Sequence, residues 1–165
     1  MTSGKIATCA LLTTVAMVLS YVEAMMPIPF PVPGMKLGLA NLAIILVLYL
    51  YSWREALLVS VVRILLSGFL FGNVMSIAFS LAGGFLSLLL MALIKKTKWL
   101  PMMGISMIGG VTHNLGQLIV AMIVLQTTKI GYYFAALMVT GAITGLLIGL
   151  LGSAIYERLK KVAVK

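Results

Sequence analysis

Residues 74–98 read VMSIAFSLAGGFLSLLLMALIKKTK, which is a run of twenty-one uncharged residues followed by a basic cluster. A hydrocarbon core about 30 Å thick is crossed by roughly 20 apolar residues in a helix. Lys and Arg beside such a helix stay on the cytoplasmic side. This stretch therefore predicts a membrane-spanning helix whose carboxyl end lies at the inner surface.

The composition extends this prediction to the whole chain of 165 residues. Hydrophobic residues make up 62% of it, charged residues only 9%, and the mean hydropathy is +1.19. A water-soluble domain uses about 25% charged residues to cover its surface. We therefore expect residues 1–165 to form a single transmembrane domain.

Six apolar segments are candidates for spans, at about residues 6–24, 37–51, 55–71, 74–94, 100–126 and 131–156. The predicted fold is an all-α integral membrane bundle of six transmembrane helices. The first segment also resembles a secretory signal, since Val22-Glu23-Ala24 is similar to a cleavage site. Five further spans follow it, so we interpret it as an uncleaved first helix.

The basic residues predict the orientation. With both termini in the cytoplasm, nine of the twelve basic residues lie at the inner surface: Lys5, Arg54, Lys95, Lys96, Lys98, Arg158, Lys160, Lys161 and Lys165. Only Lys36 and Lys129 then lie outside, and Arg63 lies within a span. The net charge of +9 is thus an orientation signal that suits the lipid bilayer, and we expect no nucleic-acid partner. The predicted location is the cell membrane, with several crossings.

Several kinds of chemistry are excluded by missing residue types. The chain has no Asp, and its acids are Glu23, Glu55 and Glu157. One Cys and one His rule out a disulfide framework or a zinc cluster, and there is no Walker motif for nucleotide hydrolysis. We predict no catalytic residue, no metal site and no cofactor.

Prolines alternate with apolar residues in the first outer loop, Pro27-Ile28-Pro29-Phe30-Pro31-Val32-Pro33-Gly34. Each proline fixes φ and keeps its predecessor out of the helical region, so the loop is extended and stiff. Two interpretations stay open: a lid over the outer mouth of the bundle, or a plain connector. Lys36 follows directly and adds a cation there.

Arg63 lies in the middle of a predicted span. A charge at the bilayer centre costs about 2.5–3.5 kcal/mol on insertion scales, so such residues face a partner or a watery cavity. Glu23 is the candidate partner in a structural ion pair. The functional alternative is a cation that binds an anionic solute.

His113, Asn114 and Gln117 form a second polar group within a span. Positions i, i+1 and i+4 of a helix lie within about a 100° arc, so the three side chains are able to face one cavity. Asn41 and Asn73 are candidates to join them. Polar side chains at this depth either hold helices together or contact a ligand.

Small residues recur every four positions at Gly141, Gly145 and Gly149, and the first helix offers the looser pair Ala10 and Thr14. Such ladders let another helix approach closely. Packing within the bundle is one interpretation, and docking of a partner membrane protein is the other.

Four motifs resemble one family of small membrane proteins, the Gx transporters, also called heptaprenyl diphosphate synthase component I. They are Pro31-Val32-Pro33-Gly34-Met35-Lys36-Leu37-Gly38-Leu39-Ala40-Asn41, Arg54-Glu55-Ala56-Leu57, Ser80-Leu81-Ala82-Gly83-Gly84 and His113-Asn114-Leu115-Gly116-Gln117. The resemblance covers roughly Ala7 to Gly152. This family is similar to the S-components of energy-coupling-factor (ECF) transporters.

The resemblance implies a six-helix protein that binds a vitamin-like solute from outside. S-components pair with a transmembrane scaffold subunit and two cytoplasmic ATPases, often docking through Ala-x-x-x-Ala in the first helix. Ala10 and Thr14 are only looser equivalents of that pattern. The synthase name conflicts with the absence of Asp, because chain-elongating prenyl synthases hold diphosphate and magnesium through Asp-rich motifs.

Two hypotheses follow. In the first, the chain is the substrate-binding subunit of an ECF-type importer for a small anionic, partly apolar solute, such as an isoprenoid or quinone precursor or a vitamin. Its binding residues are then Lys36, Asn41, Arg63, Asn73, His113, Asn114 and Gln117. In the second, the chain is a non-catalytic membrane subunit of a polyprenyl diphosphate synthase, contacting its partner through the basic loop 95–98 and the carboxyl-terminal tail.

Overall fold

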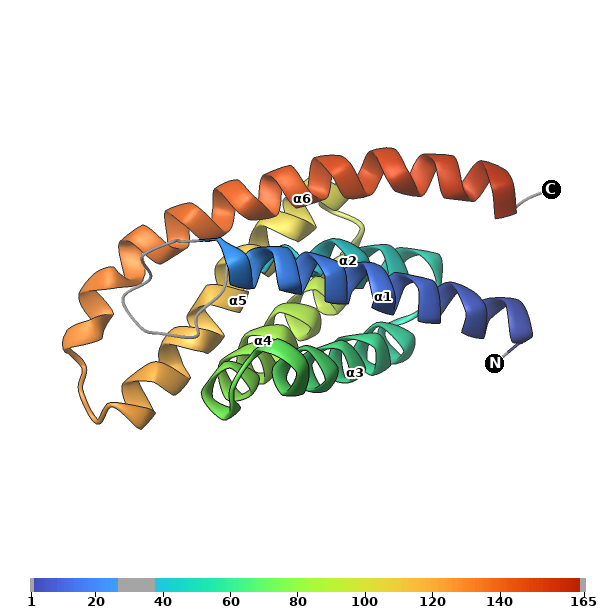
Figure 1. Cartoon of the computed structure of the whole chain (residues 1–165). Helices are drawn as coiled ribbons and strands as arrows, with labels where there is room; N and C mark the ends of the chain where they lie inside the picture. The colour runs from blue at the N-terminus through green and yellow to red at the C-terminus, as the bar shows by residue number, and fades with distance from the viewer. Residues whose placement is uncertain (1, 27–37, 164–165) are drawn as a thin grey trace.

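The computed structural model describes residues 2–26 and 38–163, which form six α-helices and one 3-10 helix (Figure 1). The helices are α1 (Ser3–Met25), α2 (Asn41–Leu50), α3 (Trp53–Phe71), α4 (Val74–Thr97), α5 (Met102–Val124) and α6 (Phe134–Ala163), and the 3-10 helix η1 (Lys129–Tyr133) precedes α6. The described part of the chain contains no β-strand. The predicted all-α class is therefore confirmed.

Helix boundaries follow the apolar segments closely, with one exception. Five helices begin and end within a few residues of the expected limits, although α6 continues beyond 156 to Ala163. The exception is α2, which begins at Asn41 rather than at 37. Gly38 has φ +87° and opens a turn at residues 39 and 40, which keeps the chain out of the helix until Asn41.

Four helical stretches are long and apolar enough to cross a membrane: Ser3–Met25, Val74–Thr97, Met102–Val124 and Lys129–Lys160. With 10 residues, α2 is about 15 Å long, half the thickness of a hydrocarbon core. α3 has 19 residues but carries Arg54, Glu55 and Arg63. Length and apolarity thus support four crossings directly, and crossings by α2 and α3 stay a prediction.

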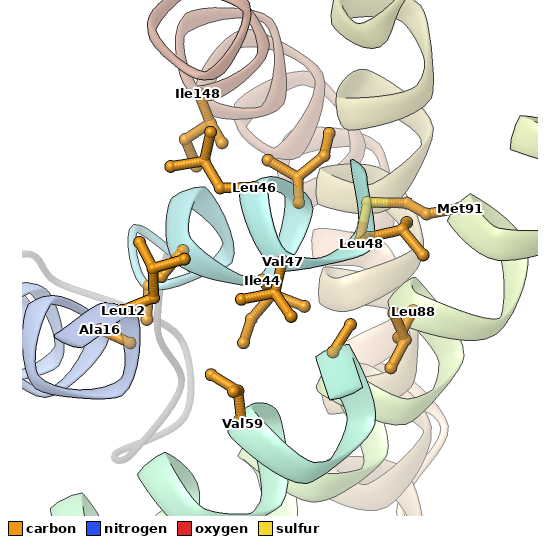
Figure 2. Close-up of a cluster of buried hydrophobic side chains, with 14 of the residues drawn as sticks. Leu12, Ala16, Ile44, Leu46, Val47, Leu48, Val59, Leu88, Met91 and Ile148 are labelled. Carbon is orange, nitrogen blue, oxygen red and sulfur yellow. The ribbon is translucent and has the colours of Figure 1, made fainter. Parts of the chain in front are cut away.

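The short helix α2 lies inside the bundle, in contact with α1, α3, α4 and α6. Every side chain from Ala43 to Leu48 is buried, so this helix has no exposed face over two turns. Figure 2 shows Ile44, Val47 and Leu48 surrounded by side chains from the neighbouring helices. We call this region the aliphatic core; it is the larger of two apolar clusters.

Most of the basic residues that the structure describes lie at one end of the bundle. The start of α1, the end of α6 and the α2–α3 connection lie there together (Figure 1). Lys5 Nζ lies 2.5 Å from Glu55 Oε1, and Lys95 Nζ donates to the carbonyl of Leu48 at 2.6 Å near the end of α2. The start of α1 and the end of α6 thus lie at the same end of the bundle, as the predicted orientation requires.

Glycines form the contact between α5 and α6. A methyl group on Gly110 would lie 2.1 Å from the carbonyl oxygen of Gly141. One on Gly145 or Gly149 would lie 2.5 Å from Ser106 O or 2.6 Å from Met103 Cα. All three α6 glycines are buried against α5, so this face is covered by the chain itself. The contacts favour packing for this ladder over the docking role that was the alternative.

Candidate solute-binding site

Buried polar side chains from four helices form a layer beside the aliphatic core. The layer consists of Ser20 and Glu23 on α1, Asn41 on α2, Arg63 on α3, and His113 and Gln117 on α5. Each is at most 6% exposed. A second, smaller apolar cluster consists of Phe79, Leu118, Ala121 and Leu137. This polar layer brings together four of the residues predicted from sequence.

Arg63 is the buried cation of the polar layer. Its side chain is 2% exposed, and Nη1 donates to Ser20 Oγ at 3.2 Å. The negative charge of Glu23 also acts on the guanidinium. Within the described part of the chain, buried Nε and Nη2 have no hydrogen-bond partner, nor does Ser67 Oγ one turn further along α3. An unsatisfied buried donor costs about 1–3 kcal/mol. A hydrogen-bond acceptor that bound to Nε and Nη2 of Arg63 would remove this cost.

Glu23 holds the turn that precedes α2. Its Oε1 accepts a hydrogen bond of 2.6 Å from the backbone N–H of Gly38, and the side chain is 6% exposed. A hydrogen bond to a carboxylate is stronger than one between neutral groups. The last turn of α1 and the entry to α2 are therefore tied together at the edge of the polar layer.

His113 lies between two glycines that allow close approach. A methyl group on Gly38 would lie 3.0 Å from Asn41 Nδ2 and 3.3 Å from His113 Cδ2. One on Gly83 of α4 would lie 3.0 Å from His113 Nδ1. His113 Nε2 and Gln117 Nε2 are 3.0 Å apart and share a hydrogen bond. The imidazole thus connects α5 with α4 and with the turn before α2.

Asn114 and Asn73 are engaged elsewhere. Asn114 Nδ2 donates to the carbonyl of Leu137 at 2.7 Å, so it joins α5 to α6. Asn73 is exposed and caps α4: its Oδ1 accepts from the N–H of Ser76 at 2.8 Å, and Ser76 Oγ accepts from the Asn73 N–H. The expectation that Asn73 joins the polar group is not met, because its side chain is the N-cap of α4.

Three predicted residues remain: Lys36, Ala10 and Thr14. Lys36 and the proline-rich loop fall outside the described residues. Ala10 and Thr14 lie on an exposed face of α1, with Thr14 Oγ1 bonded to the carbonyl of Ala10 at 3.1 Å. This pair is accessible to a partner, unlike the glycines of α6.

Sequence reasoning missed two members of this site. Ser20 is not among the binding residues predicted from sequence, and Gly38 appears there only as part of a motif. No local pattern places Ser20 beside Arg63, since the two are 43 positions apart. Gly38 carried a usable signal, because a glycine just before a helix often supplies a positive φ.

The fold is that of a solved membrane transport protein. The S component of a bacterial ECF transporter matches this chain with a TM-score of 0.75 over 98% of both chains, at 19% sequence identity. With its apolar, membrane-length helices, this chain is a membrane protein with the S-component fold.

Residues 12–155 match the family described as heptaprenyl diphosphate synthase component I. The chain belongs to this family, as its motifs predicted. No protein with a curated description matches it significantly.

Proposed function

We propose that this protein is the substrate-binding subunit of an ECF-type importer in the cell membrane, and that it binds a small anionic, partly apolar solute from the outer side. The protein would carry out no chemistry of its own. Isoprenoid or quinone precursors and vitamins fit this description of the solute. The S-component fold supports the general role.

The observation that carries the proposal is the unsatisfied edge of Arg63. Two buried N–H donors on a guanidinium match two oxygens of a carboxylate or a phosphate. Membrane proteins retain such a charge mainly where it serves a ligand or an ion path. Asn41, His113 and Gln117 would orient the rest of the solute, and Lys36 with the proline-rich loop is assigned a closing role from sequence alone.

The partners in this proposal are a transmembrane scaffold subunit and a pair of ATPases. The exposed pair Ala10 and Thr14 on α1 is the candidate docking face, because small side chains let a second helix approach closely. A complex purified from native membranes in mild detergent should contain these subunits. Mass spectrometry of the same sample should identify the bound solute.

The decisive variant is Arg63→Ala. Once the co-purified solute is identified, its affinity should fall at least about a hundredfold, because each hydrogen bond from a charged group is worth about 1.5–3 kcal/mol. Arg54→Ala is the matched control, since Arg54 is an exposed arginine on the same helix. Both variants should insert and purify. Unchanged affinity in Arg63→Ala would exclude this site.

The family description favours a second candidate, a membrane accessory subunit of a polyprenyl diphosphate synthase. The contact surface would be the basic end, where Lys96 and Lys98 are exposed. This function predicts that a synthase subunit co-purifies without any ATPase. It also predicts that Arg63→Ala leaves that association intact while a Lys96→Glu, Lys98→Glu double variant weakens it.

A further inference from the structure

A groove on the outside of the bundle runs between α3 and α4, away from the polar layer. Its volume is about 470 Å³. The walls include Leu57 on α3 and Phe85, Leu89 and Leu93 on α4, and the end residues are Trp53 and Lys96. None of these residues belongs to the proposed solute site, so the groove needs its own explanation.

The lining of the groove extends along α4. Phe85, Leu89 and Leu93 follow each other along one face of α4, and Lys96 comes one turn later. Phe85 and Lys96 are eleven positions apart, which is about 16 Å along a helix. The three apolar side chains are 59%, 44% and 49% exposed, so the groove faces the surrounding membrane.

The end at Lys96 carries positive charge. Lys96 is exposed, and no hydrogen bond or ion pair joins it to another described residue. Beside it, Trp53 stacks with the Arg54 guanidinium, 5.8 Å from the ring centroid. The nearest acid in sequence, Glu55, is already bound by Lys5 and Ser52. An anionic headgroup would meet no unpaired carboxylate here.

The neighbouring residue, Lys95, differs from Lys96 because its ammonium group has contacts within the protein. Lys95 donates to the Leu48 carbonyl at 2.6 Å and lies 4.8 Å from the Tyr49 ring centroid, so it serves the fold of α2. Lys96 has no such task. Of these two adjacent residues of α4, Lys95 stabilises the fold, and Lys96 is available to bind an anion.

We propose that this groove binds one anionic phospholipid, with an acyl chain against Leu57, Phe85, Leu89 and Leu93 and the phosphate at Lys96. The indole N–H of Trp53 supplies a second donor at headgroup depth. Basic pockets between transmembrane helices on the cytoplasmic side suit such headgroups. The apolar walls and the single cationic end fit the two parts of this lipid.

Trp53 is itself the reporter for a test. The chain has two tryptophans, and Trp99→Phe leaves Trp53 as the only indole. The full-length Trp99→Phe protein is placed in nanodiscs of phosphatidylcholine that contain a small, equal fraction of acyl-brominated phosphatidylglycerol or acyl-brominated phosphatidylcholine. Bromine quenches an adjacent indole. The brominated anionic lipid should occupy the groove about fivefold more strongly, which is ~1 kcal/mol for one lysine near the lipid surface.

Adding Lys96→Ala should remove this preference, and adding Lys160→Ala should keep it, because Lys160 is an exposed lysine on α6 outside the groove. Equal quenching by the two brominated lipids would overturn the proposal, and so would a preference that survives Lys96→Ala. Recovery of Trp53 fluorescence at trace amounts of a prenyl diphosphate, but not of unbrominated phosphatidylglycerol, would assign the groove to that other amphiphile instead.

Discussion

The aliphatic core and the polar layer are equally buried but are filled with opposite chemistry. Ile45, Val47 and Leu48 in the first region are 0–2% exposed, and Arg63 and Gln117 in the second are 2% and 0% exposed. The same helices contribute to both regions. At the basic end, apolar side chains fill the interior, and the charged residues that join helices there, Lys5, Glu55 and Lys95, are only partly buried. Helix packing at that end therefore does not require a fully buried charge.

The cost of the polar layer supports a functional reason for it. A charged side chain deep in a bilayer is expensive, and Arg63 recovers only part of that cost through Ser20 and Glu23. Polar groups that hold helices together are normally satisfied by one another. The unpaired donors on Arg63 are therefore the feature on which the proposed binding role of this layer rests.

The largest effect, on the yield of folded protein, is expected at the contact between α5 and α6. Gly110→Leu places a side chain against the backbone of Gly141, where even a methyl group would lie 2.1 Å from the carbonyl oxygen. Backbone atoms have no rotamer with which to yield, so we expect loss of folded protein, measured as monodisperse yield in detergent. Gly104→Ala on the same helix is the control, because its nearest contact would be an ordinary 3.4 Å. A normal yield of Gly110→Leu would contradict the close α5–α6 contact.

A smaller effect is expected within the aliphatic core. Leu48→Ala removes a side chain that is 2% exposed and packed among buried neighbours (Figure 2). The cavity should lower the free energy of unfolding by about 2–4 kcal/mol, measured by thermal unfolding in detergent. Solute affinity at equal folded concentration should be unchanged. If affinity fell with stability, the two regions would be coupled.

The smallest effect on stability is expected in the polar layer. Gln117→Leu keeps the side-chain volume and removes an amide that is hydrogen-bonded to His113. Removing one partner of a buried hydrogen bond costs about 1–3 kcal/mol, so stability should fall by less than in Leu48→Ala. Solute affinity should fall about tenfold, the value of one or two neutral hydrogen bonds. A variant that loses stability but keeps affinity would make Gln117 a packing residue.

Sequence predicted the helices well because apolar runs of membrane length leave few alternatives. Arg63 and His113 were recognisable for a similar reason, since a charged or titratable side chain within such a run stands out against its background. The start of α2 at Asn41 was not predicted, because hydropathy does not register that Gly38 turns the chain before it, although its end at Leu50 lies within one residue of the predicted limit.

The direction in which individual side chains point could not be predicted from the sequence. Asn114 and Gln117 are three positions apart, yet one bonds to the backbone of α6 and the other to His113. From sequence, the glycine ladder of α6 was equally consistent with docking of a partner protein and with packing inside the bundle. Only the position of α5 against these glycines favours packing. Such choices depend on how helices distant in sequence pack, which no local pattern records.

The 10-residue length of α2 has an electrical consequence. In the predicted orientation, with α2 along the membrane normal and its end at the inner surface, its rise of about 15 Å would place the turn at Gly38 and the polar layer beside it near half the depth of a 30 Å hydrocarbon core. An anion that bound at Arg63 from the outer surface, as proposed above, would then cross roughly half of the transmembrane voltage. Since a full crossing is worth about 2.3 kcal/mol per charge at 100 mV, loading of such a solute in an energised membrane, negative inside, is opposed by ~1.2 kcal/mol for each negative charge that enters without a compensating proton.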